Sequence, residues 1–357
     1  MEKKLPPHTL TVTDDELQPA KRSSRASGGY TLRDVARIAG VAPITASRAL
    51  NTPGAVSAPI LARVREAVER TGYVPNMLAG GLASRKSRLV AAVVPTISGS
   101  VFLDMVQSLT GTLAGAGYQL MLGQSGYENS REDALLEAII GRRPDGVVLT
   151  GIMRSDQGRR RLLASGIPVV ETWDLTPTPI DMLVGFSHEQ IGSAVADYLH
   201  QRGRRRVAIL SANDERALRR NQAFADAAIR LGMGSAAVPT CTVSAPTTLG
   251  SGRTGLGELL ARDPAIDAVF CSSDMMALGV LMEAQARGIA VPDQLAVVGV
   301  GDQAFARDVH PALTSVRIDG TRIGSKAADF IIARAEGKLV TDRVIDIGFA
   351  IVERAST

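Results

Sequence analysis

The sequence predicts a small all-α head followed by an α/β core that is built from two parallel-sheet subdomains. Between Thr31 and Gly72, apolar residues recur at helical spacing in three short segments that are separated by turn residues. From Leu89 onward, apolar runs of strand length alternate with amphipathic helical segments, and this rhythm occurs twice. Strands that are apolar throughout and alternate with helices are typical of parallel sheets covered on both faces.

The head is predicted to begin at Thr31, which serves as the N-cap of the first helix. The apolar face of that helix is formed by Leu32, Val35, Ala36 and Ala39. Gly40 ends the helix, and a second helix, PITASRAL, follows with Pro43 in its first turn, where a missing N–H costs little. Ser57 is predicted to cap a third helix, which ends at Gly72.

Three short helices, the first two joined by a tight turn, indicate a helix-turn-helix unit whose second helix enters the major groove of DNA. Residues 1–88 carry 14 Lys and Arg against 7 Asp and Glu, a net charge of +7, whereas the rest of the chain has a net charge of −3. A basic head on a mildly acidic body favours a polyanionic partner. The alternative is a three-helix subdomain that only packs on the rest of the chain.

Several classes of protein are disfavoured by what the sequence lacks. No apolar run is long enough to span a membrane, and residues 1–29 are polar throughout, so we expect a cytoplasmic protein with a disordered tail and no signal peptide. The two cysteines and four histidines are scattered, which predicts neither a metal site nor a disulfide framework. No P-loop occurs, and Gly250–Gly257 does not fit a nucleotide fingerprint, so we expect no cofactor and no enzyme.

The core is predicted to contain strands at LVAAVVP, YQLMLG, DGVVLTG and IPVVETWD in its first half. The second half repeats the rhythm with VAIL, AVPTCTV, AVFCSS and LAVVGVG. Ligands of such sheets bind beyond the carboxyl ends of the strands or between subdomains.

Several motifs, in one order, resemble the lactose-repressor/galactose-repressor (LacI) family. They are TLRDVARIAGVAPITASRALN, GYVPNMLAGGLASRKS, FSHEQIGSAVADYL, SSDMMALGVL, VPDQLAVVGVGD and LTSVRIDGTRIGSKAADFI, and the likeness covers residues 30–355. The segments YENSREDALLEAIIGRRPDGVVLT, LVGFS, DERALRR and DIGF most resemble gluconate-operon repressors.

The resemblance implies a homodimer with periplasmic-binding-protein-like cores. In each core, two doubly wound subdomains would be joined by three crossovers, near 174–187, 302–318 and 340–347. The implied domains are a tail (1–29), a DNA-binding head (30–74), a hinge (75–88) and an effector-binding and dimerisation core (89–357). The partners would be double-stranded operator DNA and a small effector that acts through a two-state switch.

The DNA-binding residues that the resemblance implies lie in the head and the hinge. They are Thr31, Leu32, Pro43, Ile44, Thr45, Ser47, Arg48, Asn51, Ser57, Asn76, Ala79 and Leu82. In the family, Leu82 wedges open a base step in the minor groove, with Ala79 allowing close approach. Pro43 and Ile44 depart from the polar base readers of lactose-repressor-type heads, so the half-site is not transferable. Gly80 and Gly81 are expected to weaken the hinge helix off DNA.

The effector-binding residues that the resemblance implies line the cleft between the subdomains. They are Thr96, Ser98, Val101, Phe102, Tyr127, Thr150, Arg154, Trp173, Phe186, Arg220, Asp274 and Asp302. Arg154 falls where the lactose repressor has an acid that accepts sugar hydroxyls. An arginine there that faces Arg220 would suit a carboxylate or phosphate, which favours a sugar acid such as gluconate.

The sequence is therefore interpreted as that of a repressor of sugar-acid metabolism genes that its effector releases from a palindromic operator. A regulator that responds to a neutral sugar or a purine is the alternative. A sugar-binding protein or a sugar enzyme is a more remote one.

Overall fold

The computed structural model describes residues 29–74, 86–97, 100–126, 129–233 and 237–357. The chain forms two compact units, and the boundary between them in the sequence falls between Arg85 and Lys86. Most of the predicted tail, and residues 75–85 of the predicted hinge, lie outside the described residues. In the part that is described, no helix is both long enough and apolar enough to cross a membrane.

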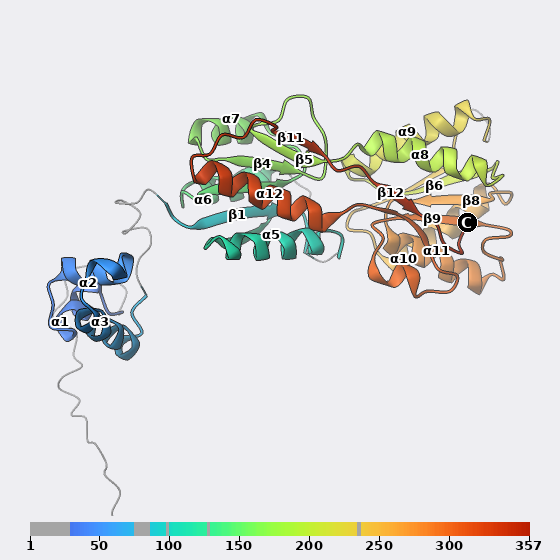
Figure 1. The fold of residues 1–357 in the computed structure, drawn as a ribbon. Helices are drawn as coiled ribbons and strands as arrows, with labels where there is room; N and C mark the ends of the chain where they lie inside the picture. Colours follow the sequence, from blue (N-terminus) through green and yellow to red (C-terminus); the bar gives the residue numbers. More distant parts are fainter. Residues whose placement is uncertain (1–28, 75–85, 98–99, 127–128, 234–236) are drawn as a thin grey trace, which may run out of the picture. The chain divides into compact units, whose positions relative to one another are not determined.

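The first unit holds α1 (Leu32–Ile38), α2 (Pro43–Asn51) and α3 (Ala58–Thr71), at the blue end of the chain in Figure 1. The Thr31 hydroxyl accepts a hydrogen bond from the Asp34 N–H, and the Asp34 carboxylate accepts one from the Thr31 N–H, so Thr31 caps α1 as predicted. Gly72 ends α3 with φ 61°. Ser57 occupies the N-cap position of α3, but its side chain makes no capping hydrogen bond there, so that part of the prediction is wrong.

The core of this unit is made from small side chains on all three helices. Val35 and Ala36 of α1, Ala46 and Ala49 of α2, and Val64 and Ala67 of α3 are buried. Because alanine lets helix backbones approach closely, a unit this small still forms a packed interior. The opposite face of α2 is not part of this core and is exposed.

The second unit begins with a six-stranded sheet in the order β11-β5-β4-β3-β1-β2. Its strands are β1 (Leu89–Val94), β2 (Gln119–Gln124), β3 (Gly146–Thr150), β4 (Val169–Thr172), β5 (Met182–Gly185) and β11 (Val344–Asp346), all parallel. Successive residues of β1 point to opposite faces of this sheet, and each face is covered by a layer of helices. One layer holds α5 (Leu103–Gly115) and α12 (Gly320–Ala335), and the other holds α6 (Asn129–Ile140) and α7 (Asp156–Ser165).

A second six-stranded sheet has the order β12-β10-β9-β8-β6-β7. Its strands are β6 (Val207–Ala212), β7 (Thr240–Val243), β8 (Ala268–Cys271), β9 (Ala296–Val300), β10 (Thr314–Arg317) and β12 (Ala350–Val352). One face is covered by α8 (His188–Gln201) and α9 (Glu215–Arg230), the other by α10 (Leu249–Arg262) and α11 (Asp274–Ala286). The strands pair in parallel, as predicted, except that β12 at the edge of the sheet pairs antiparallel with β10.

The chain passes between the two sheets after β5, between β10 and α12, and between β11 and β12. These passages fall at the carboxyl-terminal ends of the three predicted crossover ranges. Within the predicted ranges lie β5, β10 and β11, which belong to the sheets themselves. The two-subdomain α/β architecture is thus the predicted one, with the crossings shorter than expected.

Candidate functional site

The outward face of α2 is the candidate DNA-reading surface. Pro43, Ile44, Arg48 and Asn51 are exposed on it, because the buried Ala46 and Ala49 fix the opposite side of the helix in the head core. Ile44 is 64% exposed, which is unusual for a large apolar side chain and leaves it open to a thymine methyl group. Arg48 makes no ion pair with any described residue.

The other predicted DNA-binding residues of the head are placed less uniformly. Thr45 and Ser47 are half-buried, and the Ser47 hydroxyl accepts a hydrogen bond of 3.2 Å from the Asn51 amide. Leu32 packs against the head core, whereas Thr31 and Ser57 are exposed at helix starts. Asn76, Ala79 and Leu82 lie outside the described residues.

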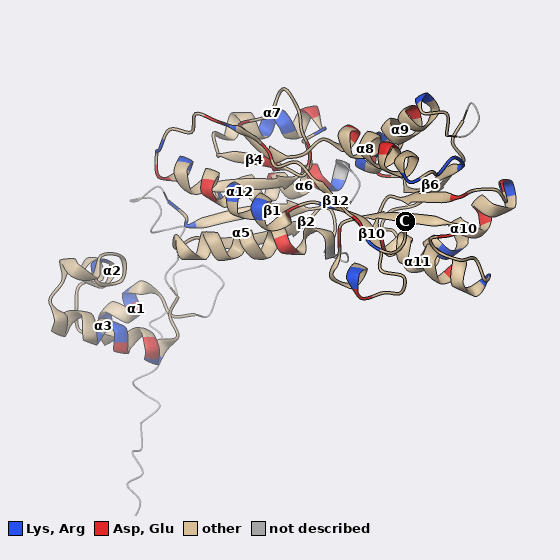
Figure 2. Cartoon of the chain, turned by 45° about the vertical axis from the view of Figure 1, so that its right-hand side comes forward, with Lys and Arg blue, Asp and Glu red and all other residues tan. Residues whose placement is uncertain are grey.

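The net positive charge of the head favours binding to a polyanion. Among residues 29–74 there are six arginines against Asp34, Glu66 and Glu69. Both signs of charge occur along α3, as Figure 2 shows, whereas the sequence of α2 contains Arg48 and no acid. The Thr31 hydrogen bonds hold the pKa of Asp34 below its ordinary value, so this acid remains ionised and engaged in the cap of α1.

The core encloses a cavity of about 560 Å³, a volume suited to a small molecule. Parallel strands from both sheets end at it, as expected for ligand sites in such folds. From the first subdomain and the crossings it is lined by Thr96, Val101, Phe102, Trp173, Phe186, His188 and Ile318. From the second subdomain it is lined by Ala212, Asp214, Arg216, Arg220, Ala245, Pro246, Thr247, Thr248, Leu249, Ser272, Ser273, Met275, Val300, Gly301 and Gln303.

One wall of this cavity is aromatic. The ring of Trp173 lies 5.0 Å from that of Phe102 and 5.9 Å from that of Phe186, both edge to face, and Phe186 stacks edge to face on His188. Edge-to-face pairs hold each ring in a fixed orientation. The wall therefore presents a rigid apolar surface to one side of a ligand.

A second wall, which adjoins the aromatic one at Phe102 and His188, is cationic. Arg216 and Arg220 lie one turn apart on α9, so their guanidinium groups share a face of the helix. Burial lowers the pKa of Arg220 to about 10, which still leaves it charged at neutral pH. Its Nη1 donates to His188 Nδ1 at 2.9 Å and its Nη2 to the Ser272 carbonyl at 3.3 Å, while its Nε has no partner among the described residues.

Arg216 adds a second positive charge that carboxylates only partly compensate. Its Nε lies 3.8 Å from an Asp214 oxygen, and its guanidinium lies over the Phe102 ring at 5.5 Å. The Asp214 carboxylate also caps α9 by accepting from the Ala217 N–H. Together with hydroxyls at residues 247, 248, 272 and 273, the two arginines can hold an oxygen-rich anion.

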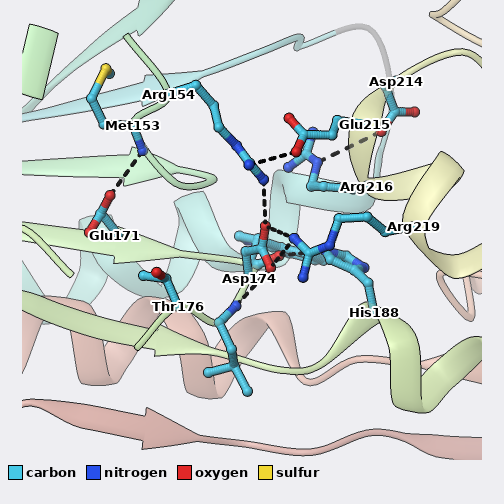
Figure 3. A network of polar contacts seen from close by, with 12 residues as sticks. Met153, Arg154, Glu171, Asp174, Thr176, His188, Asp214, Glu215, Arg216 and Arg219 are labelled. Carbon is cyan, nitrogen blue, oxygen red and sulfur yellow. Dashed lines mark hydrogen bonds and ion pairs between the residues drawn. The ribbon is translucent and has the colours of Figure 1, made fainter. Parts of the chain in front are cut away.

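A second cavity of about 410 Å³ adjoins the first and shares Asp214, Arg216 and Ala245 with it. Thr150 and Arg154 line this second cavity. Arg154 is paired with Glu215 at 2.6 Å and with Asp174 at 3.8 Å, as Figure 3 shows. Arg154 and Arg220 therefore line different cavities, and carboxylates of the protein itself pair with the Arg154 guanidinium, so the structure does not bring the two arginines to one cavity as the prediction expected.

Asp274 and Asp302 line neither cavity, contrary to the prediction. The Asp274 carboxylate is fully buried and accepts hydrogen bonds from the Gln303 N–H at 2.7 Å and the Ser315 hydroxyl at 2.6 Å. The Asp302 carboxylate pairs with Arg354 at 2.6 Å and with Arg317 at 3.3 Å. Asp274 therefore holds the backbone of Gln303, which does line the first cavity.

The structure brings together about half of the predicted effector residues. Thr96, Val101, Phe102, Trp173, Phe186 and Arg220 line the first cavity, and Ser98 and Tyr127 lie outside the described residues. Sequence reasoning missed Arg216, His188 and Gln303. Of these, Arg216 could have been found, because it lies four residues, or about one helical turn, before Arg220. No cluster that could hold a metal ion occurs among the residues that the structure describes.

Comparisons with known proteins agree with this architecture. Residues 31–76 match the family of bacterial regulatory proteins of the lacI family, and residues 196–357 match the periplasmic binding protein-like domain. The HTH-type transcriptional regulator GntR of Pseudomonas aeruginosa is 37% identical over 94% of this chain and 98% of its own length. The protein belongs to the LacI family.

Two further relatives extend the comparison. The HTH-type transcriptional regulator GntR of Escherichia coli K12 is 30% identical over 90% of this chain and 96% of its own. A crystal structure of a LacI family transcriptional regulator from Silicibacter pomeroyi matches with a TM-score of 0.86 and 31% identity, covering 92% of this chain and 99% of that one. The protein is thus a DNA-binding transcription regulator and not an enzyme, as predicted.

Proposed function

We propose that this regulator is a repressor that a small sugar acid of the gluconate class releases from its operator. The observation that carries the proposal is the pair of arginines on α9, Arg216 and Arg220, which lies beside an aromatic wall in a cavity of about 560 Å³. A carboxylate is recognised best by planar guanidinium donors, and the hydroxyls around it suit a polyol chain. The resemblance to gluconate-operon repressors supports the same class of effector.

The repressor acts as a homodimer on a palindromic operator in this proposal. Two heads would place their α2 helices in successive major grooves, and Leu82 of each hinge would enter the minor groove. The effector would favour the state in which the heads no longer hold operator spacing, and it can do so only through a difference in its affinity for the two states.

Isothermal titration with gluconate, gluconamide and glucose tests the effector class. Gluconamide keeps the polyol chain but replaces the carboxylate by a neutral amide, so it is the matched control. We expect gluconate to bind at least tenfold more tightly than gluconamide. Trp173 is the only tryptophan and lines the cavity, so its fluorescence should change on binding. Equal binding of the two compounds would refute the proposal.

A second experiment tests the direction of the effect on DNA. Fluorescence anisotropy on an operator fragment, selected from random DNA by the protein itself, should show weaker operator binding when gluconate is added. A stronger complex would indicate co-repression. A neutral sugar remains the second candidate because the aromatic wall of Phe102, Trp173 and Phe186 could stack on a sugar ring. Glucose that binds as tightly as gluconate would favour it.

A further inference from the structure

A continuous run of polar contacts leads from the cationic wall of the first cavity into the first subdomain. Arg220 Nη1 contacts His188 Nδ1 at 2.9 Å, and His188 Nε2 contacts the carbonyl oxygen of Trp173 at 3.0 Å. The Trp173 indole N–H then donates to the sulfur of Met105 at 2.9 Å, on α5. Every side chain in this run is buried.

Only one tautomer of His188 satisfies both of its contacts. The Trp173 carbonyl can only accept, so Nε2 must carry the proton, and the lone pair of Nδ1 then accepts from Arg220. Burial, together with the charges of Arg220, Arg216 and Arg219, lowers the pKa of His188 to about 2. The ring is therefore neutral throughout the physiological range, and the acceptor that faces Arg220 is permanent.

Close packing of α8 on α9 sets this geometry. A Cβ atom on Gly192 of α8 would collide with the backbone carbonyl oxygen of Arg220, so the absence of a side chain there lets the two helices approach. His188 is the first residue of α8, and its ring reaches Arg220 across this contact. The backbone of Arg220 is thus held close to α8 by the protein itself, before any ligand arrives.

The other end of the run is a residue in an uncommon conformation. Trp173 has φ 65°, in the left-handed region that non-glycine residues seldom adopt. Such backbone positions persist only where their surroundings hold them, and they often occur at ligand clamps and switches. His188 Nε2 is one of the contacts that hold Trp173, and the edge-to-face rings of Phe102 and Phe186 are others.

We propose that His188 is a positioning residue with two separable tasks: its Nδ1 orients Arg220 toward the anionic group of the effector, and its Nε2 transmits the arrival of the effector to Trp173 and α5. The proposal rests on the proposed function, because Arg220 needs an anionic effector for either task. An effector that draws the Arg220 guanidinium toward itself would shift the ring of His188, and with it the carbonyl that the ring holds.

Two amide variants separate the two tasks. In H188N, the side-chain oxygen lies near the position of Nδ1 and can accept a hydrogen bond from Arg220. The shorter side chain does not reach the Trp173 carbonyl, so that hydrogen bond is lost. The amide nitrogen of H188Q reaches the place of Nε2 and can donate to that carbonyl, but it gives up the Nδ1 acceptor. H188L makes neither contact and is the matched apolar control.

The measured quantities are gluconate affinity by titration and the ratio of operator affinities without and with saturating gluconate. H188N should bind gluconate within about threefold of wild type but show a reduced operator ratio. H188Q should bind about tenfold more weakly and retain the wild-type ratio at saturation, and H188L should lose both. Equal gluconate affinity of H188N and H188L, or an unchanged ratio in H188N, would overturn the proposal.

Nitrogen-15 spectra of ligand-free protein give a readout that needs neither a folded variant at His188 nor an effector. In a protein whose other histidines, His8, His200 and His310, are replaced by glutamine, His188 should show a protonated Nε2 and an unprotonated Nδ1 from pH 5.5 to 8. The opposite tautomer, or a titration in that range, would overturn the proposal. Wild-type protein that binds no gluconate would instead count against the proposed function, and the tautomer would still decide the role of His188.

Discussion

The two adjoining cavities of the core both gather arginines, but the protein compensates their charges differently. In the second cavity, Arg154 is held between Glu215 and Asp174, and Asp174 is also bound by Arg219 (Figure 3). In the first cavity, Arg220 contacts a neutral histidine and a backbone carbonyl, and one of its nitrogens has no partner among the described residues. The partners of an arginine, more than its presence, therefore decide whether a cavity can bind an anion.

The largest expected effect comes from removing the buried charge of the first cavity. Arg220→Leu should weaken gluconate binding about a thousandfold, since truncating one partner of a buried charged pair costs roughly 2–5 kcal/mol. Titration calorimetry measures the loss, and operator binding without effector should persist. Arg220→Lys serves as the control: it keeps the charge without the planar fork, so an intermediate loss is expected. Unchanged gluconate affinity in Arg220→Leu would break the distinction between the two cavities.

A second effect concerns the acid behind the first cavity. Burial raises the pKa of Asp274 to about 6 from its ordinary value of 3.8, despite hydrogen bonds from Ser315 and Gln303 that favour the ionised form. Because the folded state binds this proton more tightly than the unfolded state does, the contribution to stability is complete below pH 4 and is lost as the pH rises through about 6. The loss amounts to about 3 kcal/mol at most.

Asp274→Asn should remove this dependence. Calorimetric unfolding at pH 4.5 and pH 7.5 should show a steeper decline of stability in wild type than in the variant. Asp302→Asn is the comparison variant: it should still lose stability between these two pH values, because burial, the largest cause of the raised pKa of Asp274, is unchanged in it. If the stability of wild type and of Asp274→Asn depended on pH in the same way, the pKa of Asp274 would not be raised in the folded state.

A smaller effect is expected at the edge that the two cavities share. Arg216→Gln should weaken gluconate binding about tenfold, because its guanidinium is only partly compensated by Asp214 and would form one charge-assisted contact to the ligand in the proposed complex. Arg219→Gln removes the same charge from the same helix, but Arg219 already pairs with Asp174 and Glu189, so a change below about threefold is expected. Equal losses in the two variants would mean that net charge, and not the placement of Arg216, governs binding.

Sequence patterns predicted the elements with strong local signals. Eight of the strands and the capped head helix followed from apolar runs and from Thr31, and Phe102, Trp173 and Arg220 were found because the family resemblance places them at the cleft. β5, β10 and β11 were missed because they lie in segments that were predicted as crossovers. β11 and β12 are strands of three residues, which carry no periodicity. His188 was missed because a lone histidine carries no local signal, and its partners Trp173 and Arg220 are distant in sequence.

Arg154 shows most clearly that the position of a residue in the sequence does not settle its role. Its substitution is also expected to change gluconate affinity the least. Its place in the sequence indicated a ligand-binding arginine, but its ion pair with Glu215 joins two elements that no local pattern links. Arg154→Gln should therefore change gluconate affinity by less than about threefold in titrations. A double-mutant cycle with Glu215→Gln should give a coupling of about 0.2–1 kcal/mol in thermal unfolding, because both side chains are partly exposed. A loss of gluconate affinity as large as that of Arg216→Gln would place the anion in the second cavity, and the comparison between the two cavities would then have to be reversed.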